Sequence, residues 1–235
     1  MLDRYTGFPF CRYPLLVLLL IAGAAASQDR QPANFDVEDR EKALGNRIVF
    51  PEFKGDVSAM MDCFSIVETG GKMKDYGCFA KDQFDAPFAE AVNYAAKKAR
   101  LNPAVIDGKK REVYLQFRAE FIAEGDERTI DLYLNPGFAE NIEAYGYDHV
   151  AGQRVIGKES WLGVCPQRSR YSLWVRAYLG EDGTTDNVTV IHSAGIVPTE
   201  ACQNAIKETI LSSLYTPALA DGVPVPSTYV EMFGN

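Results

Sequence analysis

The side chains best suited to chemistry in this sequence are two histidines and five cysteines. His149 follows Asp148, and His192 precedes Ser193. A hydrolytic site needs a nucleophile, a base and an orienting group that converge in space. Neighbours on a strand point to opposite faces, so His192 and Ser193 alone do not form such a site. The sequence also lacks a nucleophile elbow, a zinc-protease motif, a phosphate-binding loop and a dinucleotide-binding turn. We therefore expect no catalytic, cofactor-binding or metal-binding residue and interpret the chain as a non-enzyme.

The first 27 residues have the pattern of a secretory signal peptide. Arg4 and Arg12 precede an apolar run, 14–26, that ends in small residues. The alternative is an uncleaved membrane anchor, but the run has 13 residues and a membrane span needs about 20. We expect cleavage after Ser27, no membrane span in the remaining chain, and an oxidising compartment for the mature protein.

Export changes the expected role of the cysteines. Cys11 lies in the signal segment, which leaves the other cysteines for disulfides. Cys63 and Cys78 flank a predicted hairpin with the turn sequence TGGK. The simplest register pairs Thr69 with Lys72 and Val67 with Lys74, and it places the two cysteines opposite each other. Cys165 and Cys202 form the second pair by elimination, the alternative for Cys202 being a buried thiol on a helix. No C-x-x-C sequence is present to indicate a thiol oxidoreductase.

Composition limits the classes of partner. The chain has 235 residues, of which 47% are hydrophobic and 24% charged, enough for one large or two small folded domains. Its formal net charge is −8. Phosphate binding needs a cationic face, so this charge argues against nucleic acid as the main partner.

A sequence unit occurs twice, with an offset of 114 residues: PAVIDG at 103–108 is matched by PALADG at 217–222. Each copy follows a hairpin pattern and an amphipathic helix pattern, and a strand comes after it. The predicted elements are helices at 84–100 and 199–214, strands at 113–121 and 129–134, and a closing strand next to the C-terminus. The offset is longer than solenoid repeats of about 20–50 residues. We therefore interpret the chain as a duplicated α+β domain.

The expected organisation is a signal peptide at 1–27, a polar and loosely ordered segment at 28–50, a first unit at 51–135, a linker at 136–160 and a second unit at 161–235. Within the linker, the pattern near 138–145 predicts a short helix.

The order of strand, turn, strand, helix, Pro-Ala-x-x-Asp-Gly and strand resembles the C-terminal domain of TonB, the periplasmic energy-transducing protein. VRAYLGEDGTTDNVTVIHSAG resembles the first hairpin of that family, CQNAIKETILSSLYTPALADGVPV its helix and turn, and STYVEMF its closing strand. The first unit resembles a more divergent copy. The likeness covers 58–121 and 170–233, and it implies two tandem units, each an antiparallel hairpin, a helix and a closing strand.

The resemblance implies a non-catalytic periplasmic interaction module of a Gram-negative bacterium, linked to TonB-dependent outer-membrane transport. Its partner would be an outer-membrane receptor peptide, or another envelope protein, that adds a strand to a sheet edge. The implied edge strand includes Thr228, Tyr229, Val230 and Glu231. The alternative is that this strand pairs with the other unit and leaves no free edge.

Two other functions remain open. One is an envelope hydrolase with a site between the two units. The other is a membrane-anchored energy transducer of the TonB type, which requires that the N-terminal segment is not cleaved. TonB itself has a spanning helix with a functional histidine and then a proline-rich spacer. Here the apolar run is short, lacks histidine and is followed by no such spacer.

Overall fold

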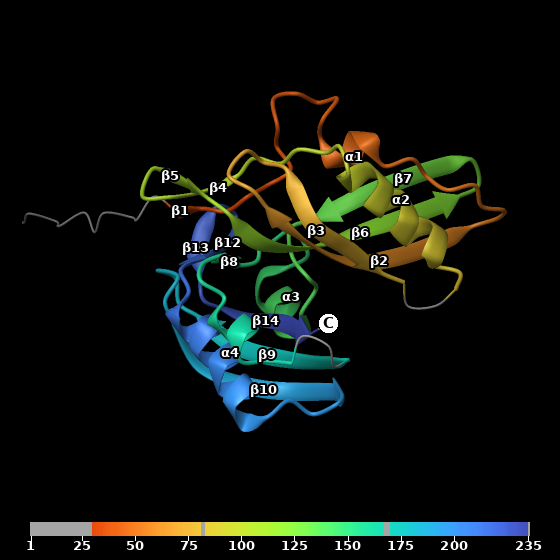
Figure 1. Ribbon diagram of the computed structural model, residues 1–235. Helices are drawn as coiled ribbons and strands as arrows, with labels where there is room; N and C mark the ends of the chain where they lie inside the picture. Colours follow the sequence, from red (N-terminus) through yellow and green to blue (C-terminus); the bar gives the residue numbers. More distant parts are fainter. Residues whose placement is uncertain (1–29, 81–82, 167–169, 235) are drawn as a thin grey trace, which may run out of the picture.

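The computed structural model describes residues 30–80, 83–166 and 170–234. Over these ranges the chain is an α+β protein with four helices and mostly antiparallel sheets (Figure 1). The predicted signal peptide lies outside the described residues. In the part of the chain that is described, no helix is both long and apolar enough to cross a membrane.

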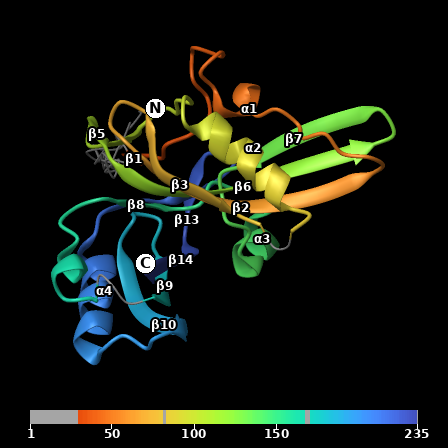
Figure 2. The same ribbon diagram turned by 45° about the vertical axis from the view of Figure 1, so that its right-hand side comes forward.

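The first half is a sheet covered by one helix. Its elements are β2 (Val57–Val67), β3 (Met73–Phe79), α2 (Ala86–Ala96), the short hairpin β4 (Ala104–Ile106) and β5 (Lys109–Arg111), β6 (Val113–Glu124) and β7 (Glu127–Tyr133). The strands lie in the order β3-β2-β6, and β7 pairs with the outer edge of β6. Alternate residues of β6, among them Leu115 and Phe117, are buried on the side where α2 packs (Figure 2). This alternation was visible in the sequence.

The second half has the same order of elements. It contains β9 (Tyr171–Leu179), β10 (Thr185–Gly195), α4 (Glu200–Ser212), the hairpin β12 (Ala218–Ala220) and β13 (Val223–Val225), and β14 (Ser227–Gly234). The sheet order is β10-β9-β14, which corresponds to β3-β2-β6. α4 begins at a true N-cap, because the Thr199 side chain accepts a hydrogen bond from the Cys202 amide.

The offset of 114 residues holds in three dimensions. β9, α4, β12, β13 and β14 each begin 114 residues after β2, α2, β4, β5 and β6. The two Asp-Gly turns also match, because Asp107 and Gly108 have φ of 52° and 70°, and Asp221 and Gly222 have 51° and 77°. Two successive left-handed residues favour Asp-Gly in a tight hairpin turn. The repeated motif is therefore a repeated local structure.

The first hairpin corrects the predicted register. Val67 pairs with Met73 rather than Lys74, but Cys63 still faces Cys78 and forms a disulfide with it. The pairing shifts by one residue between Phe64 and Ile66. At this shift Asp75 adopts a left-handed φ of 45°. The resulting bulge on β3 restores the register at the cysteines.

The second disulfide joins Cys165, just before β9, to Cys202 in α4. Both cysteine pairings predicted from the sequence are present. The pair Cys165–Cys202 attaches the helix to the segment that enters the sheet, and both residues are buried.

The segment before the first sheet is packed, and the expectation of a loosely ordered segment is wrong. It contains β1 (Arg30–Gln31) and α1 (Leu44–Arg47), and β1 pairs with β4. Ala33 and Leu44 are fully buried in the first core. These apolar side chains, spaced among polar ones, explain the packing.

The segment between the two repeated units connects them structurally. It contains α3 (Ala139–Tyr145), as predicted, then β8 (Gln153–Val155) and the 3₁₀ turn η1 (Ser160–Gly163). β8 pairs with β6 of the first half on one side and with β11 (Tyr215–Thr216) of the second half on the other. The two halves therefore share a strand.

Candidate functional site at the outer edge of the last strand

β14 is an edge strand in the described sheet of the second half. It pairs with β9 from Ser227 to Gly234 without a register shift. Tyr229 and Phe233 point into the core beside α4, where Tyr229 packs edge-on against Tyr215 and Phe233 against Trp161. Packing on this face holds the strand in place.

The main chain of β14 alternates between its two edges. Thr228 directs both its N–H and its C=O away from β9, because both bind the side chain of Asn141 in α3. In an antiparallel pair, residues two apart direct these groups to the same edge, so Val230 and Met232 also direct theirs outward. Among the described residues, no further hydrogen bond reaches those groups of Val230 or Met232. Val230 is 4% exposed, whereas Met232 is half-buried, so the edge reaches solvent only near Met232.

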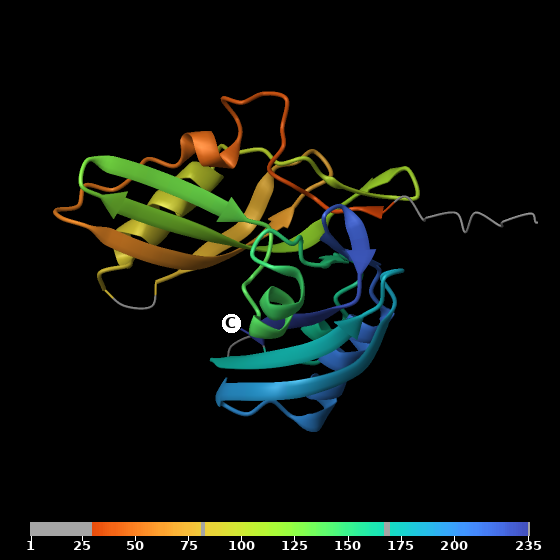
Figure 3. The same ribbon diagram turned by 180° about the vertical axis from the view of Figure 1, so that it is seen from behind.

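Helix α3 covers the start of that edge. Figure 3 shows α3 in front of β14, with α4 on the far side of the sheet. The Asn141 side chain donates to the Thr228 carbonyl at 2.9 Å and accepts from its amide at 3.0 Å. The Thr228 hydroxyl donates to Glu140 at 2.6 Å, and the Tyr145 hydroxyl donates to the Pro226 carbonyl at 2.7 Å. Glu140 also lies 3.6 Å from the guanidinium of Arg176, which pairs with Val230, so the helix reaches as far as Val230.

Glu231 anchors β14 to β8, the strand that the two halves share. Its carboxylate receives two hydrogen bonds from the Arg154 guanidinium of β8, at 2.7 and 2.8 Å, and a third from the Tyr229 hydroxyl. Glu159 binds the same guanidinium at 2.8 Å. Arg154 and Glu231 are 2% and 4% exposed. Burial opposes the charge of Arg154, but the Glu231 carboxylate outweighs it and raises the pKa of Arg154, which therefore stays protonated.

For the tyrosines near Glu231, burial acts in the opposite direction and raises the pKa. The pKa of Tyr229 lies well above its usual value, first because of burial and then because of the Glu231 carboxylate. Tyr114 of β6 shows the same direction and the same two causes, although it belongs to the first half. A second anion next to Glu231 is thus disfavoured, and the tyrosines remain neutral hydrogen-bond donors.

A second buried cation, Arg118, holds the residues on either side of α3. The Arg118 guanidinium lies 5.0 Å from the ring centroid of Tyr133 and 5.1 Å from that of Tyr147. It also donates to the Asn135 side chain at 2.9 Å, and Asn135 in turn binds the carbonyls of Tyr147 and His149. Burial, followed by a hydrogen bond to Glu120, raises the pKa of Tyr133 to about 12. This cluster ties both ends of the α3 segment to the first sheet.

The two histidines have different surroundings. His149 is 2% exposed, and its Nδ1 donates to the Gly146 carbonyl at 2.7 Å. Within the described residues its Nε2 has no hydrogen-bond partner. His192 is exposed on β10 and pairs across the strands with Trp174. The described part of the chain contains no group of three or more metal-ligating side chains.

Two other sheet edges are less regular. The pairing of β10 with β9 has two register shifts, and the pairing of β3 with β2 has one. Bulges of this kind twist an edge and discourage a further strand. β14 and β7 lack a shift, and most residues of β7 are exposed.

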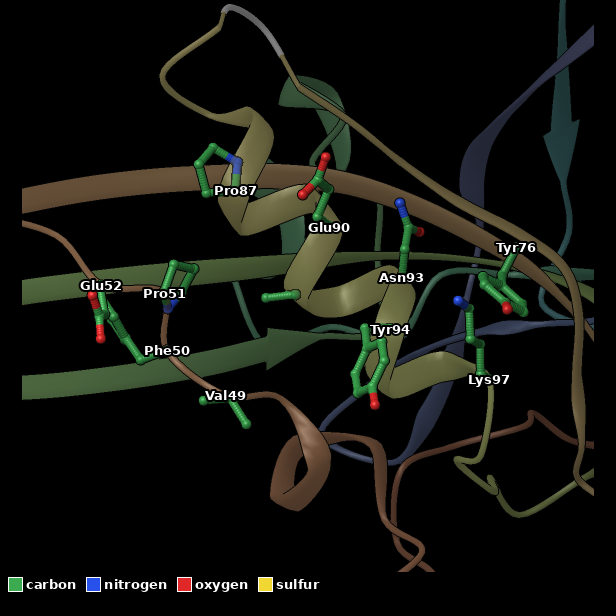
Figure 4. Close-up of a pocket in the computed structure, with 11 residues that line it drawn as sticks. Val49, Phe50, Pro51, Glu52, Tyr76, Pro87, Glu90, Asn93, Tyr94 and Lys97 are labelled. Atoms are coloured by element: carbon green, nitrogen blue, oxygen red, sulfur yellow. The ribbon is translucent and has the colours of Figure 1, made fainter.

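A groove on the outer face of α2 has a volume of about 610 Å³. Figure 4 shows side chains of α2 between the segment 49–52 and Tyr76 of β3. Its lining mixes apolar side chains with the isolated charges Glu52, Glu90 and Lys97. None of the residues singled out in the sequence lies in it.

The structure separates the predicted edge residues into two groups. Thr228 and Val230 direct main-chain groups outward, whereas Tyr229 and Glu231 direct theirs to β9 and their side chains inward. Sequence reasoning missed Asn141, Arg154 and Met232. Of these, only Met232 carries a signal in the sequence, since it follows Thr228 and Val230 in the alternation.

Comparisons with known protein families, curated proteins and solved structures give no match for this chain.

Proposed function

We propose that this protein is an exported, non-catalytic interaction module of the Gram-negative periplasm, composed of two tandem units that resemble the TonB C-terminal domain. The outer edge of β14 takes up an extended peptide of an outer-membrane receptor in TonB-dependent transport. The observation that carries this proposal is the bulge-free strand whose outward main-chain groups at the half-buried Met232 have no hydrogen bond among the described residues. Main-chain hydrogen bonds would supply the affinity and neighbouring side chains the register.

The first half supplies an example of such an added strand. β6 is the counterpart of β14, and β7 pairs with its outer edge from Arg118 to Glu124. At the offset of 114 residues, Arg118 corresponds to Met232. The repeated sheet thus accepts an antiparallel strand at this position in one half, and the other half leaves the position open among the described residues.

The two disulfides support an extracytoplasmic location, because thiols stay reduced in most cytosolic proteins. The signal-peptide pattern of residues 1–27 agrees with this location. No observation favours the hydrolase alternative, since Ser193 lies beside His192 on an exposed strand and His149 is buried with its Nδ1 engaged.

The test uses the mature chain and a panel of synthetic peptides that cover periplasm-facing segments of outer-membrane receptors. The variant Met232→Pro removes an outward N–H, and proline is tolerated at such edge positions. We expect it to weaken peptide binding about tenfold or more, since it removes a main-chain donor and blocks close strand approach. Isothermal titration calorimetry measures the change.

The matched control is Ser193→Pro on the outer edge of β10. Ser193 faces Leu173, whose main-chain groups point toward β14, so the Ser193 N–H also points outward. The control should bind like the unchanged chain. Equal weakening by both prolines, or binding that neither changes, would argue against β14 as the site. Circular dichroism confirms that each variant is folded.

A further inference from the structure

The groove on the outer face of α2 continues into a smaller pocket, and Tyr94 and Lys97 line both. The volume of the groove, about 610 Å³, lies within the usual range of small-molecule sites. The pocket has a volume of about 80 Å³, which is the liquid volume of roughly three water molecules. Together they form one elongated depression in the first half, wide enough for a chain in one part and for a small polar group in the other.

The groove is mainly apolar. Phe50 and Ala91 line it and pack against the first core. Val49 and Tyr94 line it as well, although they are 74% and 72% exposed. Exposed apolar side chains that gather around a hollow mark a ligand or interaction surface. In Figure 4, Tyr94 lies toward the C-terminal end of α2, and Glu52 lies on the other side of the groove.

The pocket is cationic. Arg47 of α1 lines it together with Tyr94 and Ala95 of α2 and with Lys97 and Lys98, which follow that helix. Among the described residues, no carboxylate lines the pocket and none of its three cations forms an ion pair. The chain as a whole has a net charge of −8. Like charges that lie close together repel one another, so an anion between them is favourable.

The dipole of α2 does not explain this cluster completely. Cations are favourable at the C-terminal end of a helix, which accounts for Lys97 and Lys98. Arg47 comes from another helix, and its guanidinium donates to the Glu41 carbonyl at 2.9 Å. The ammonium group of Lys97 lies 5.5 Å from the ring centroid of Tyr94. Side chains of two separate elements thus converge on one small pocket.

We propose that this depression binds a single-chain lipid with a phosphate head group. The phosphate lies in the pocket, where the guanidinium of Arg47 and the ammonium groups of the two lysines balance its charge. The hydrocarbon chain lies in the groove against Phe50 and Ala91, where it leaves water. This site belongs to the first half and does not depend on the edge of β14.

The groove suits a hydrocarbon chain better than an extended peptide. A bound peptide must find partners for its N–H and C=O groups, and leaving them unpaired in an apolar site is unfavourable. The middle turns of α2 offer none, because their main-chain groups are bonded within the helix, and Pro51 on the opposite wall has no N–H. The carboxylates of Glu52 and Glu90 repel a phosphate, so the head group lies at the end of the groove near Lys97.

The experiment titrates the mature chain with dodecyl phosphate below its micelle concentration and follows amide shifts by NMR. Inorganic phosphate lacks the chain, and dodecyl maltoside has the same chain with an uncharged head group. Dodecyl phosphate should shift the amides of Tyr94, Lys97 and Lys98 in a saturable way. It should bind at least about tenfold more tightly than either comparison compound, since each lacks one of the two contributions. Added salt should weaken its binding.

The test variant combines Lys97→Gln with Lys98→Gln. Both side chains are exposed, so the fold should be retained. Dodecyl phosphate should bind about tenfold more weakly to it, and dodecyl maltoside should bind as before. The matched control combines Lys109→Gln with Lys110→Gln on the exposed strand β5, outside the depression. It removes the same charge and should bind like the unchanged chain.

Each result decides one part of the proposal. Equal affinity for dodecyl phosphate and inorganic phosphate would overturn the role of the groove. Equal affinity for dodecyl phosphate and dodecyl maltoside, or equal weakening by both double variants, would overturn the role of the pocket. Binding only to micelles or to vesicles of phosphatidylglycerol would replace the single-lipid site by a membrane surface. If no dodecyl phosphate binds, the whole inference fails, and the proposed function of β14 is unaffected.

Discussion

At Arg154 and Glu231, opposite charges from the shared strand β8 and from β14 meet where solvent barely reaches them. Removing two charges from water is unfavourable, and the several hydrogen bonds around Glu231 offset that loss. Loss of one partner would leave the other charge buried and poorly compensated.

We therefore predict that Glu231→Gln lowers the free energy of unfolding by about 3 kcal/mol, since Arg154 keeps only Glu159 as a counter-charge. Urea unfolding followed by circular dichroism measures the change. Asp39→Asn, which breaks the exposed pair with Lys42, serves as control and should leave the midpoint unchanged. Equal effects of both substitutions would contradict the proposed role of the buried pair.

His149 makes stability depend on pH. Burial, and to a smaller extent the positive charge of Arg118, lower the pKa of His149, while its hydrogen bond to Gly146 acts in the opposite direction. The unfolded chain then binds a proton more readily than the folded chain, so stability is complete above the ordinary pKa of 6.5 and falls as pH drops below it.

The corresponding prediction compares the unchanged chain with His149→Gln between about pH 7.5 and 5.5. The unchanged chain should lose stability over this range, and the variant should lose less, because it has no imidazole to protonate. Urea unfolding at each pH supplies the values. A parallel decline in both proteins would assign the pH dependence to other groups.

At the scale of elements, the disulfides close loops of different length. The sequence separation is 15 residues for Cys63–Cys78 and 37 for Cys165–Cys202. A longer closed loop restricts the unfolded chain more. Both bonds also lie next to helix–sheet contacts of their own half.

We expect loss of Cys63–Cys78 to destabilise the chain by about 3 kcal/mol and loss of Cys165–Cys202 by about 4 kcal/mol. The variants replace both cysteines of one pair by serine, and urea midpoints measure the effect. The order of the two values is the sharper test. A larger loss for the shorter loop would mean that native-state packing, rather than loop length, decides their contributions.

The elements were largely predictable because their signals are local. The alternation of β6, the stripe of α2 and the two Asp-Gly turns each depend on neighbouring residues. The bulge at Asp75 was not predictable, because no sequence pattern marks an aspartate that adopts a left-handed backbone conformation. The site was only partly predictable: Asn141, Arg154 and Glu231 look like surface residues in the sequence, and only long-range packing buries them.

At the scale of the whole molecule, the two halves share β8 and the ion pair between Arg154 and Glu231. The Arg30 side chain adds another link, from β1 to the carbonyls of Asp182 and Tyr215. Contacts on both sides of one strand couple the unfolding of the parts they join. The halves should therefore unfold together.

Both tryptophans, Trp161 and Trp174, belong to the second unit, which makes this coupling measurable. Tryptophan fluorescence reports that unit, whereas circular dichroism at 222 nm, a standard helix wavelength, reports all helices. We predict coincident urea transitions for the unchanged chain and separated ones for Glu231→Gln. Two transitions in the unchanged chain would show that the shared strand does not couple the halves.

The most direct measurement of the binding edge is amide hydrogen exchange of β14 by NMR, with and without receptor peptides. In the free protein, the amide of Met232 should exchange fast, and those of Tyr229 and Glu231 slowly, because the latter pair with β9. A bound peptide should slow Met232 selectively. Slow exchange of the Met232 amide before any peptide is added, or fast exchange that no peptide changes, would contradict an edge that takes up a partner strand.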